Sequence, residues 1–155
     1  MHIVLVHGSG GSANSWSAVE PLLRAEGHAV TAVDNPSQSL REDVAAVTSV
    51  IDAIDGPVLL VGHSYGGAVI TDAGTHPRVR GLVYIAAWVP DEGENVTGLV
   101  GRYPEAEVGR WFTRGADGSW IPDDTAAARE ALAWDVPLEV WERKVHDRRP
   151  VSYTH

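Results

Sequence analysis

Hydrophobic positions along the first 90 residues fall into short uninterrupted runs, separated by stretches with helical spacing. The runs are bounded by Gly, Pro, Asn and Asp, and they predict buried strands at residues 3–6, 29–33, 58–61 and 82–87. Continuous apolar strands of this length are typical of a parallel sheet that is covered on both faces.

Helical patterns fill the intervals between these strands. The clearest spans residues 40–54, where the apolar residues form one stripe and Ser39 with Glu42 matches a capping box. Further helices are expected at residues 14–26 and between the third strand and Pro77. The alternation of strands and helices predicts an α/β fold, an open parallel sheet with right-handed connections and helices on both faces.

The pattern changes from Asp91 onward. Four of the six Trp residues lie in this segment, and no convincing strand is evident. Two turns and two short helices are expected, at residues 116–118, 121–124, 126–134 and 138–146. We therefore expect a partial α/β core over residues 1–90 and a helical cap over residues 91–155.

The bulk composition fits one globular domain of 155 residues, 44% of them hydrophobic and 21% charged. The net charge of −9 argues against a nucleic-acid partner, because phosphate binding needs clustered Lys and Arg. The nearest basic cluster combines Arg143 and Lys144 with Arg148 and Arg149. Acidic neighbours interrupt this cluster, which favours a solvated helix face.

Location and cofactors are inferred from what the pattern lacks. No apolar run approaches the length of a membrane span, the N-terminal residues do not resemble a signal peptide, and there is no Cys. These features predict a cytoplasmic protein without a membrane partner. No His, Asp or Glu cluster has the spacing of metal ligands, so neither a metal nor an organic cofactor is expected.

The first candidate for chemistry is a Gly-x-Ser-x-Gly motif centred on Ser64. The motif alone has low specificity, but it follows directly on the third apolar strand and leads into a helical pattern. A nucleophile elbow requires this setting, in which a tight strand-to-helix turn lifts the serine hydroxyl clear of the sheet. The alternative is that Ser64 only caps a helix in a Gly-rich turn.

A second Gly-rich segment, residues 7–12, follows the first strand. Its glycines leave backbone N–H groups available to an anion, so one interpretation is an oxyanion hole completed by the N–H of Tyr65. The other is a phosphate-binding loop. The spacing fails that motif at Ala13, and no Gly-Lys-Ser/Thr follows. Coexistence with the Ser64 turn favours the oxyanion role.

These motifs together resemble the α/β-hydrolase superfamily. The resemblance is carried by His-Gly-Ser with Trp16 downstream, by Gly-His-Ser-Tyr-Gly-Gly around Ser64, and by the run Gly-Leu-Val-Tyr-Ile-Ala-Ala-Trp-Val-Pro-Asp-Glu-Gly-Glu that begins at Gly81. The chain is most similar to small bacterial hydrolases that are themselves similar to plant esterases and hydroxynitrile lyases. The likeness covers the whole chain and implies that its strands are the third to sixth of the fold, in the spatial order 4-3-5-6.

The resemblance also implies roles for particular residues. It implies Ser64 as the nucleophile, with Ser9 and Tyr65 providing the N–H groups of the oxyanion hole. The implied substrate is a small ester-like molecule, and the candidate pocket residues are Gly8, Trp16, His63, Trp88 and Trp111. For the three Trp, packing in the core or cap is the alternative.

The remaining triad members lie beyond the matching strands. In this fold the chain order is Ser, acid, His, and the resemblance places the last two after the seventh and eighth strands. The sequence ends at His155, where the cap should lead into strand seven, so we expect both to be missing. His146 and His155 are the candidate substitutes for the base. Asp91 is the candidate acid, for which a turn leading into the cap is the alternative.

Three functional hypotheses follow. The first is a serine hydrolase acting on a small ester or related acyl substrate, with a base from His146, His155 or a second polypeptide. The second is a non-catalytic, truncated hydrolase that acts as a binding or interaction module. The third is lyase chemistry on a cyanohydrin, which needs the same His. In each case the run at 82–87 is an unpaired apolar edge, which predicts a homodimer.

Overall fold

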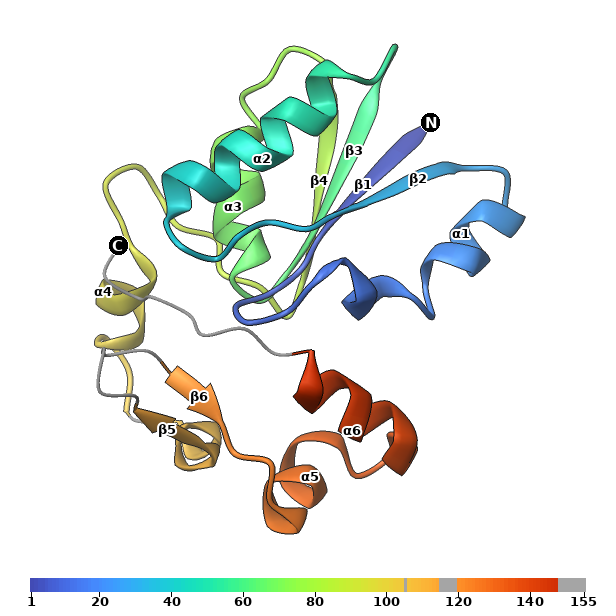
Figure 1. Ribbon diagram of the computed structural model, residues 1–155. Coiled ribbons are helices and arrows are strands. Elements are labelled where there is room, and N and C mark those ends of the chain that lie inside the picture. Colours follow the sequence, from blue (N-terminus) through green and yellow to red (C-terminus); the bar gives the residue numbers. More distant parts are fainter. Residues whose placement is uncertain (105, 115–119, 148–155) are drawn as a thin grey trace.

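A four-stranded parallel sheet forms the centre of the molecule (Figure 1). The computed structural model describes residues 1–104, 106–114 and 120–147. The strands lie in the order β2-β1-β3-β4, which confirms the predicted order 4-3-5-6. Their bounds are His2–Val6 for β1, Ala29–Val33 for β2, Val58–His63 for β3 and Val79–Ile85 for β4. Because all pairings are parallel, the carboxyl ends of the strands meet at one edge.

Helices cover both faces of this sheet, as predicted. Helices α2 (Leu40–Asp52) and α3 (Gly66–Ala73) lie on one face, and α1 (Glu20–Ala25) lies on the other (Figure 1). Ser39 caps α2 by accepting a 3.1 Å hydrogen bond from the Glu42 N–H, which is half of the expected capping box. Each face buries its own apolar cluster, so the sheet is the middle layer of the core.

The prediction of a single helix over residues 14–26 was wrong. The segment contains a short 3₁₀ helix, η1 (Ala13–Trp16), and then α1, whose first turn holds Pro21. Proline lacks an N–H donor and fits only the first turn of a helix, so it begins a new helix here.

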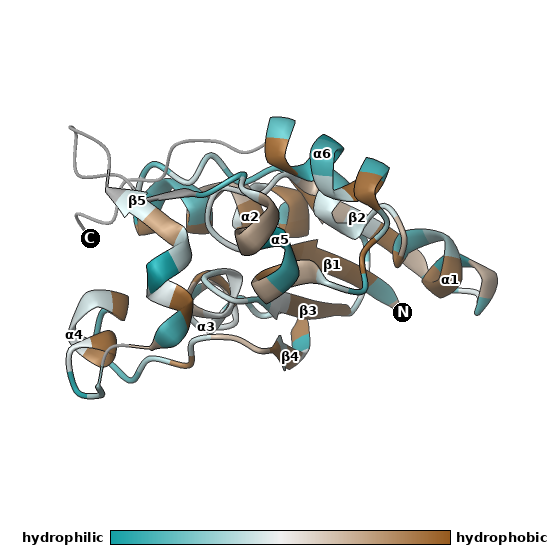
Figure 2. Cartoon of the chain, turned by 90° about the horizontal axis from the view of Figure 1, so that it is seen from below, coloured by the Kyte–Doolittle hydropathy of each residue, from teal (hydrophilic) through white to brown (hydrophobic). Residues whose placement is uncertain are grey.

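The remaining described elements form a layer beyond the carboxyl edge of the sheet, where α5 lies in front of the strand ends (Figure 2). In chain order they are α4 (Val96–Val100), η2 (Glu107–Trp111), β5 (Phe112–Arg114), β6 (Trp120–Pro122), α5 (Ala126–Ala133) and α6 (Leu138–His146). Strands β5 and β6 pair antiparallel, so the expectation of no strand after Asp91 was wrong. The turn expected at 116–118 falls outside the described residues, and residues 121 and 122 belong to β6 rather than to a turn.

None of the helices in the described part of the chain has the length and apolar character needed to cross a bilayer.

Candidate active site

A sharp bend at Ser64 connects β3 to α3. Ser64 adopts φ 53°, the left-handed region that side chains rarely occupy. The bend is tight enough that a Cβ on Gly62 would lie 2.5 Å from the carbonyl oxygen of Gly66, and a Cβ on Gly66 would lie 2.5 Å from that of Val6. These two positions therefore require glycine, because the backbone segments around the bend lie too close together for a Cβ atom. This close approach explains the two glycines of the motif.

Hydrogen bonds attach this bend to the segment after β4. The Ser64 N–H donates to the Ile85 carbonyl at 3.2 Å, and the Trp88 N–H donates to the Ser64 carbonyl at 3.1 Å. Both main-chain polar groups of Ser64 are thus satisfied within the fold, which leaves its hydroxyl as the group available for chemistry.

The glycine loop, residues 7–12, lies against the bend. A Cβ on Gly8 would approach the Cβ of Ser64 to 3.0 Å, so the two segments are in van der Waals contact. His7 is fully buried beneath the loop, and its Nδ1 lies 2.8 Å from the Gly8 carbonyl. Because a carbonyl only accepts, this contact selects the tautomer with a hydrogen on Nδ1. The sequence predicted that this glycine loop acts together with Ser64, and in the structure the loop lies next to that residue.

A cleft of about 690 Å³ opens over the bend and the loop. Its floor comes from the core: the glycine loop from Gly8 onward, η1 with Trp16, and the pair His63 and Ser64. Its opposite wall comes from the layer beyond the sheet and consists of Phe112, Leu132, Arg143, Lys144 and Asp147. An Asn14 Nδ2 to Asp147 Oδ2 hydrogen bond of 3.5 Å joins the two sides.

Five of the residues singled out from the sequence line this cleft: Gly8, Ser9, Trp16, His63 and Ser64. Tyr65 follows Ser64, but its ring is buried and its hydroxyl donates to Asp43 Oδ2 at 2.8 Å. Trp88 packs against the core, and Trp111 is half-buried in η2. Neither Trp88 nor Trp111 is among the cleft residues.

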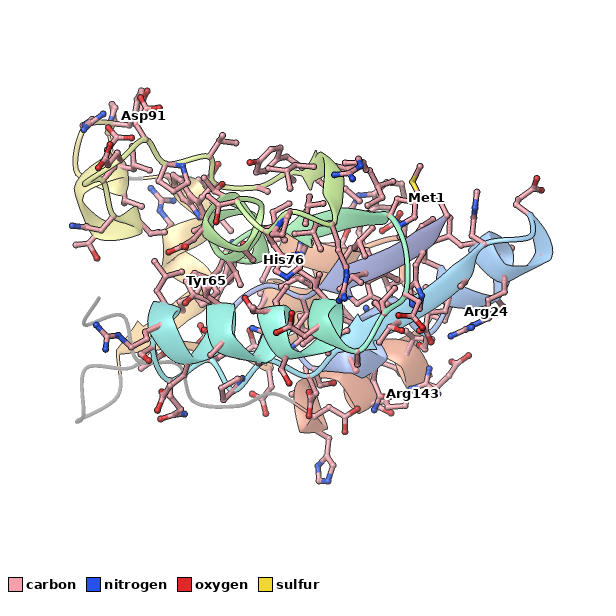
Figure 3. All side chains as sticks on the ribbon, turned by 90° about the horizontal axis from the view of Figure 1, so that it is seen from above. Met1, Arg24, Tyr65, His76, Asp91 and Arg143 are labelled. Carbon is pink, nitrogen blue, oxygen red and sulfur yellow. The ribbon has the colours of Figure 1, made fainter. Side chains whose placement is uncertain are left out.

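The two described candidates for the acid and the base, Asp91 and His146, are not brought to Ser64. Asp91 is exposed, its N–H donates to Glu94 Oε2 at 2.8 Å, and it lies far from Arg143 across the molecule (Figure 3). This hydrogen bond lowers the pKa of Glu94, with a further contribution from Arg102. The geometry is that of a capped surface turn, the alternative role for Asp91. His146 lines a second cavity of about 410 Å³, and His155 lies outside the described residues.

His63 is the one histidine among the described residues that lines the main cleft. Partial desolvation at the cleft lowers the pKa of its imidazole, and the Lys144 ammonium lowers it further, with a smaller contribution from His7. The ring is therefore uncharged at neutral pH. Within the described residues, no histidine donates to or accepts from the Ser64 hydroxyl.

A buried carboxylate behind the bend was missed by the sequence analysis. Asp43 is fully buried in the first turn of α2, where it accepts hydrogen bonds from the Tyr65 hydroxyl and, at 2.7 Å, from the Ser37 N–H. The available signal was an acidic residue on the apolar stripe of α2, between Leu40 and Val47. The residue after Ser64 is thereby attached to a second helix.

Metal chemistry has no cluster to support it here: the described residues contain no group of three or more His, Asp or Glu side chains able to hold an ion.

A serine on a strained strand-to-helix bend, at the carboxyl edge of a parallel sheet, defines the α/β-hydrolase class of fold. The comparisons agree. Residues 3–154 match the family model described as the alpha/beta hydrolase family, and the chain belongs to that family.

Relatives and solved structures extend this assignment. The chain is 33% identical over 128 residues to a carbendazim hydrolyzing esterase of Nocardioides sp. (strain SG-4G), covering 74% of this chain and 53% of the relative. It is 34% identical over 119 residues to polyneuridine aldehyde esterase of Rauvolfia serpentina, covering 67% and 45%. A crystal structure of polyneuridine aldehyde esterase superposes with a TM-score of 0.81 at 26% identity, covering 98% of this chain and 69% of that one. The chain spans about half the length of the curated relatives it matches.

Proposed function

We propose that this protein is a serine hydrolase of small esters. The observation that carries the proposal is the position of Ser64, on a strained bend against the glycine loop at the floor of a cleft. In the proposed reaction, Ser64 Oγ bonds to the acyl carbon while a base takes its proton and passes it to the departing alcohol. Water then cleaves the acyl–Ser64 ester and releases the acid.

The oxyanion formed at the acyl carbon needs hydrogen-bond donors. We assign this role to the backbone N–H groups of Ser9 and Tyr65, which belong to the two segments in contact at Gly8 and Ser64. A helix N-terminus immediately after Tyr65 favours the same negative charge.

The cleft and the relatives support a small substrate. Its volume of about 690 Å³ falls in the range of small-molecule sites, and residues 91–155 act in this proposal as a cap that supplies one wall. The two relatives described above carry esterase names.

The proposal requires a base, which determines how fast the reaction runs. Since His146 lines the other cavity, the base would come from His155 or from a second polypeptide. Without a Ser–His unit, turnover in serine hydrolases falls by about 10⁶-fold, and binding with the oxyanion hole retains about 10³–10⁴ over water.

A second candidate function is a non-catalytic binding or interaction module. It is favoured by one observation, that no histidine of the described residues forms a hydrogen bond with the Ser64 hydroxyl. The cleft would then hold a small molecule without turning it over.

A fluorophosphonate probe distinguishes these functions. We expect the folded protein to be labelled at Ser64, as located by mass spectrometry of the tryptic peptide. Ser64→Ala should abolish the label, and Ser49→Ala, at an exposed serine on α2, should leave it intact. A protein that keeps its native circular dichroism and remains unlabelled would exclude the hydrolase for this chain and favour the binding module.

Two further proposals concern self-association of the protein and its location in the cell. We propose that the chain forms a homodimer through β4, whose outer edge is unpaired within the described residues. The cytoplasmic location expected from the sequence stays a prediction, for which cell fractionation is the test.

A further inference from the structure

Two cations lie on the wall of the cleft that faces Ser64. Arg143 and Lys144 come from α6, and both side chains are exposed (Figure 3 labels Arg143). Neither side chain forms an ion pair or a hydrogen bond with any of the described residues. Unpaired cations on a solvated helix face are ordinary, but here the helix places them over the candidate nucleophile.

The charge of the cleft differs from that of the molecule. The chain carries a net charge of −9, yet the cleft residues include two cations and one described acid, Asp147, which also accepts the Asn14 amide hydrogen bond. His63, kept uncharged, adds nothing at neutral pH. The side chains lining the cleft therefore leave an excess of about one positive charge, which matches a monoanion.

The field of these cations reaches the floor of the cleft. Lys144 is close enough to lower the pKa of His63, the residue directly before Ser64. A ligand seated at Ser64 therefore lies within the same field. Arginine in addition offers a planar fork of donors that suits a carboxylate.

We infer that the preferred substrate is an ester bearing one carboxylate apart from the ester bond that is cleaved, held by Arg143 and Lys144 while the ester lies at Ser64. This inference rests on the proposed hydrolase for the reaction, although the binding of the carboxylate can be tested without turnover.

The test uses two ligands that differ by one charge, monomethyl phthalate and dimethyl phthalate. Binding is measured with the full chain carrying Ser64→Ala, by NMR titration of the His63 ring and the Trp16 indole, both of which line the cleft. We expect the monoester to bind several-fold tighter. Arg143→Gln and Lys144→Gln should each weaken it roughly two- to fivefold, as for ion pairs that keep contact with solvent, and should leave the diester unchanged.

The matched control is Arg80→Gln, which removes the same charge from an exposed arginine on β4 outside the cleft. Equal affinity for the two ligands, no response to Lys144→Gln, an equal response to Arg80→Gln, or no binding of the monoester would each overturn the inference.

His63 provides a second measurement. Because the Lys144 ammonium disfavours the imidazolium, Lys144→Gln should raise the pKa of His63 toward its usual value, and Arg80→Gln should not. An unchanged pKa in Lys144→Gln would place the ammonium outside the cleft field and contradict the inference.

The two proposals fail separately. Monoester binding that depends on Lys144, without fluorophosphonate labelling, would remove the hydrolase and retain an anion-binding cleft. Labelling of Ser64 without any preference for the monoester would retain the hydrolase and overturn the carboxylate.

Discussion

At the scale of single residues, Ser64 is one of three non-glycine residues with a left-handed backbone in the described part of the chain, together with Ser37 and Ala86. A left-handed conformation costs an L-residue about 1–2 kcal/mol relative to ordinary backbone, and the fold maintains it at Ser64 through the Ile85 and Trp88 hydrogen bonds. Of these three residues, Ser64 alone lines the cleft, which is consistent with a reactive position. The cost of its strained backbone can be measured without any assay of activity.

Replacing Ser64 by Gly should therefore stabilise the protein relative to Ser64→Ala. Glycine adopts φ 53° without a Cβ penalty, so we expect its free energy of unfolding to exceed that of the alanine variant by about 1 kcal/mol in urea denaturation.

Ser49 supplies the control for this comparison because it lies within α2. There glycine should be less stable than alanine by about 1 kcal/mol, so the sign reverses. The same sign at both positions would show that Ser64 is not strained.

The sequence predicted some cleft residues and missed others for a physical reason. The residues Gly8, Ser9 and Ser64 could be predicted because a nucleophile elbow and its partner loop require particular residue types at neighbouring positions. Lys144 and Asp147 could not be predicted as cleft residues, because the face that α6 presents to the cleft depends on how this helix packs against the rest of the protein. The interpretation of the basic cluster as a solvated face was right about the exposure of Arg143 and Lys144 and did not anticipate their position at the cleft, and Arg148 and Arg149 lie outside the described residues.

At the scale of elements, a buried hydrogen bond connects the bend to α2. The Tyr65 hydroxyl and the Ser37 N–H are donors to the Asp43 carboxylate, which has no contact with solvent. A buried charge is costly unless its hydrogen bonds are complete, so this contact holds the start of α3 against the start of α2.

Tyr65→Phe should lower the free energy of unfolding by about 1–3 kcal/mol, because it removes a donor from a buried charged group. Tyr84→Phe is the matched variant: its hydroxyl is 2.9 Å from the Thr71 hydroxyl, a neutral and partly buried pair, and about 0.5–1.5 kcal/mol is expected. Urea denaturation of both variants measures the difference. If Tyr65→Phe proved no more costly than Tyr84→Phe, Asp43 would not depend on Tyr65.

The strands of the sheet, α2 and the short helices α5 and α6 were predicted from the sequence, whereas α4, η2 and the β5–β6 hairpin were not. The four parallel strands came from apolar runs that both faces of the sheet bury. The pairing of β5 with β6 involves three residues in each strand, too few to display a period of two, and β6 ends at Pro122, which lacks the N–H a ladder uses. Strands this short form because each pairs with the other, and the residues of one strand alone do not indicate that pairing.

At the scale of the whole molecule, the sheet has an exposed apolar side at β4. Val83 is 40% exposed and Ile85 is 44% exposed, and within the described residues β4 pairs only with β3. An edge strand of this kind presents unpaired N–H and C=O groups to another chain. Two identical β4 edges related by a two-fold axis would pair antiparallel, which closes the assembly at two copies.

Val83→Lys should therefore weaken self-association. Covering the 40% of Val83 that is exposed contributes about 0.6–1.2 kcal/mol, and the change counts twice in a two-fold dimer, so the dissociation constant should rise about tenfold or more. Sedimentation velocity over a range of concentrations measures it. Val100→Lys makes the same change at a residue 49% exposed on α4 and should leave the dimer intact. A wild-type chain that sediments as a monomer at every concentration would show that the β4 edge alone does not drive pairing.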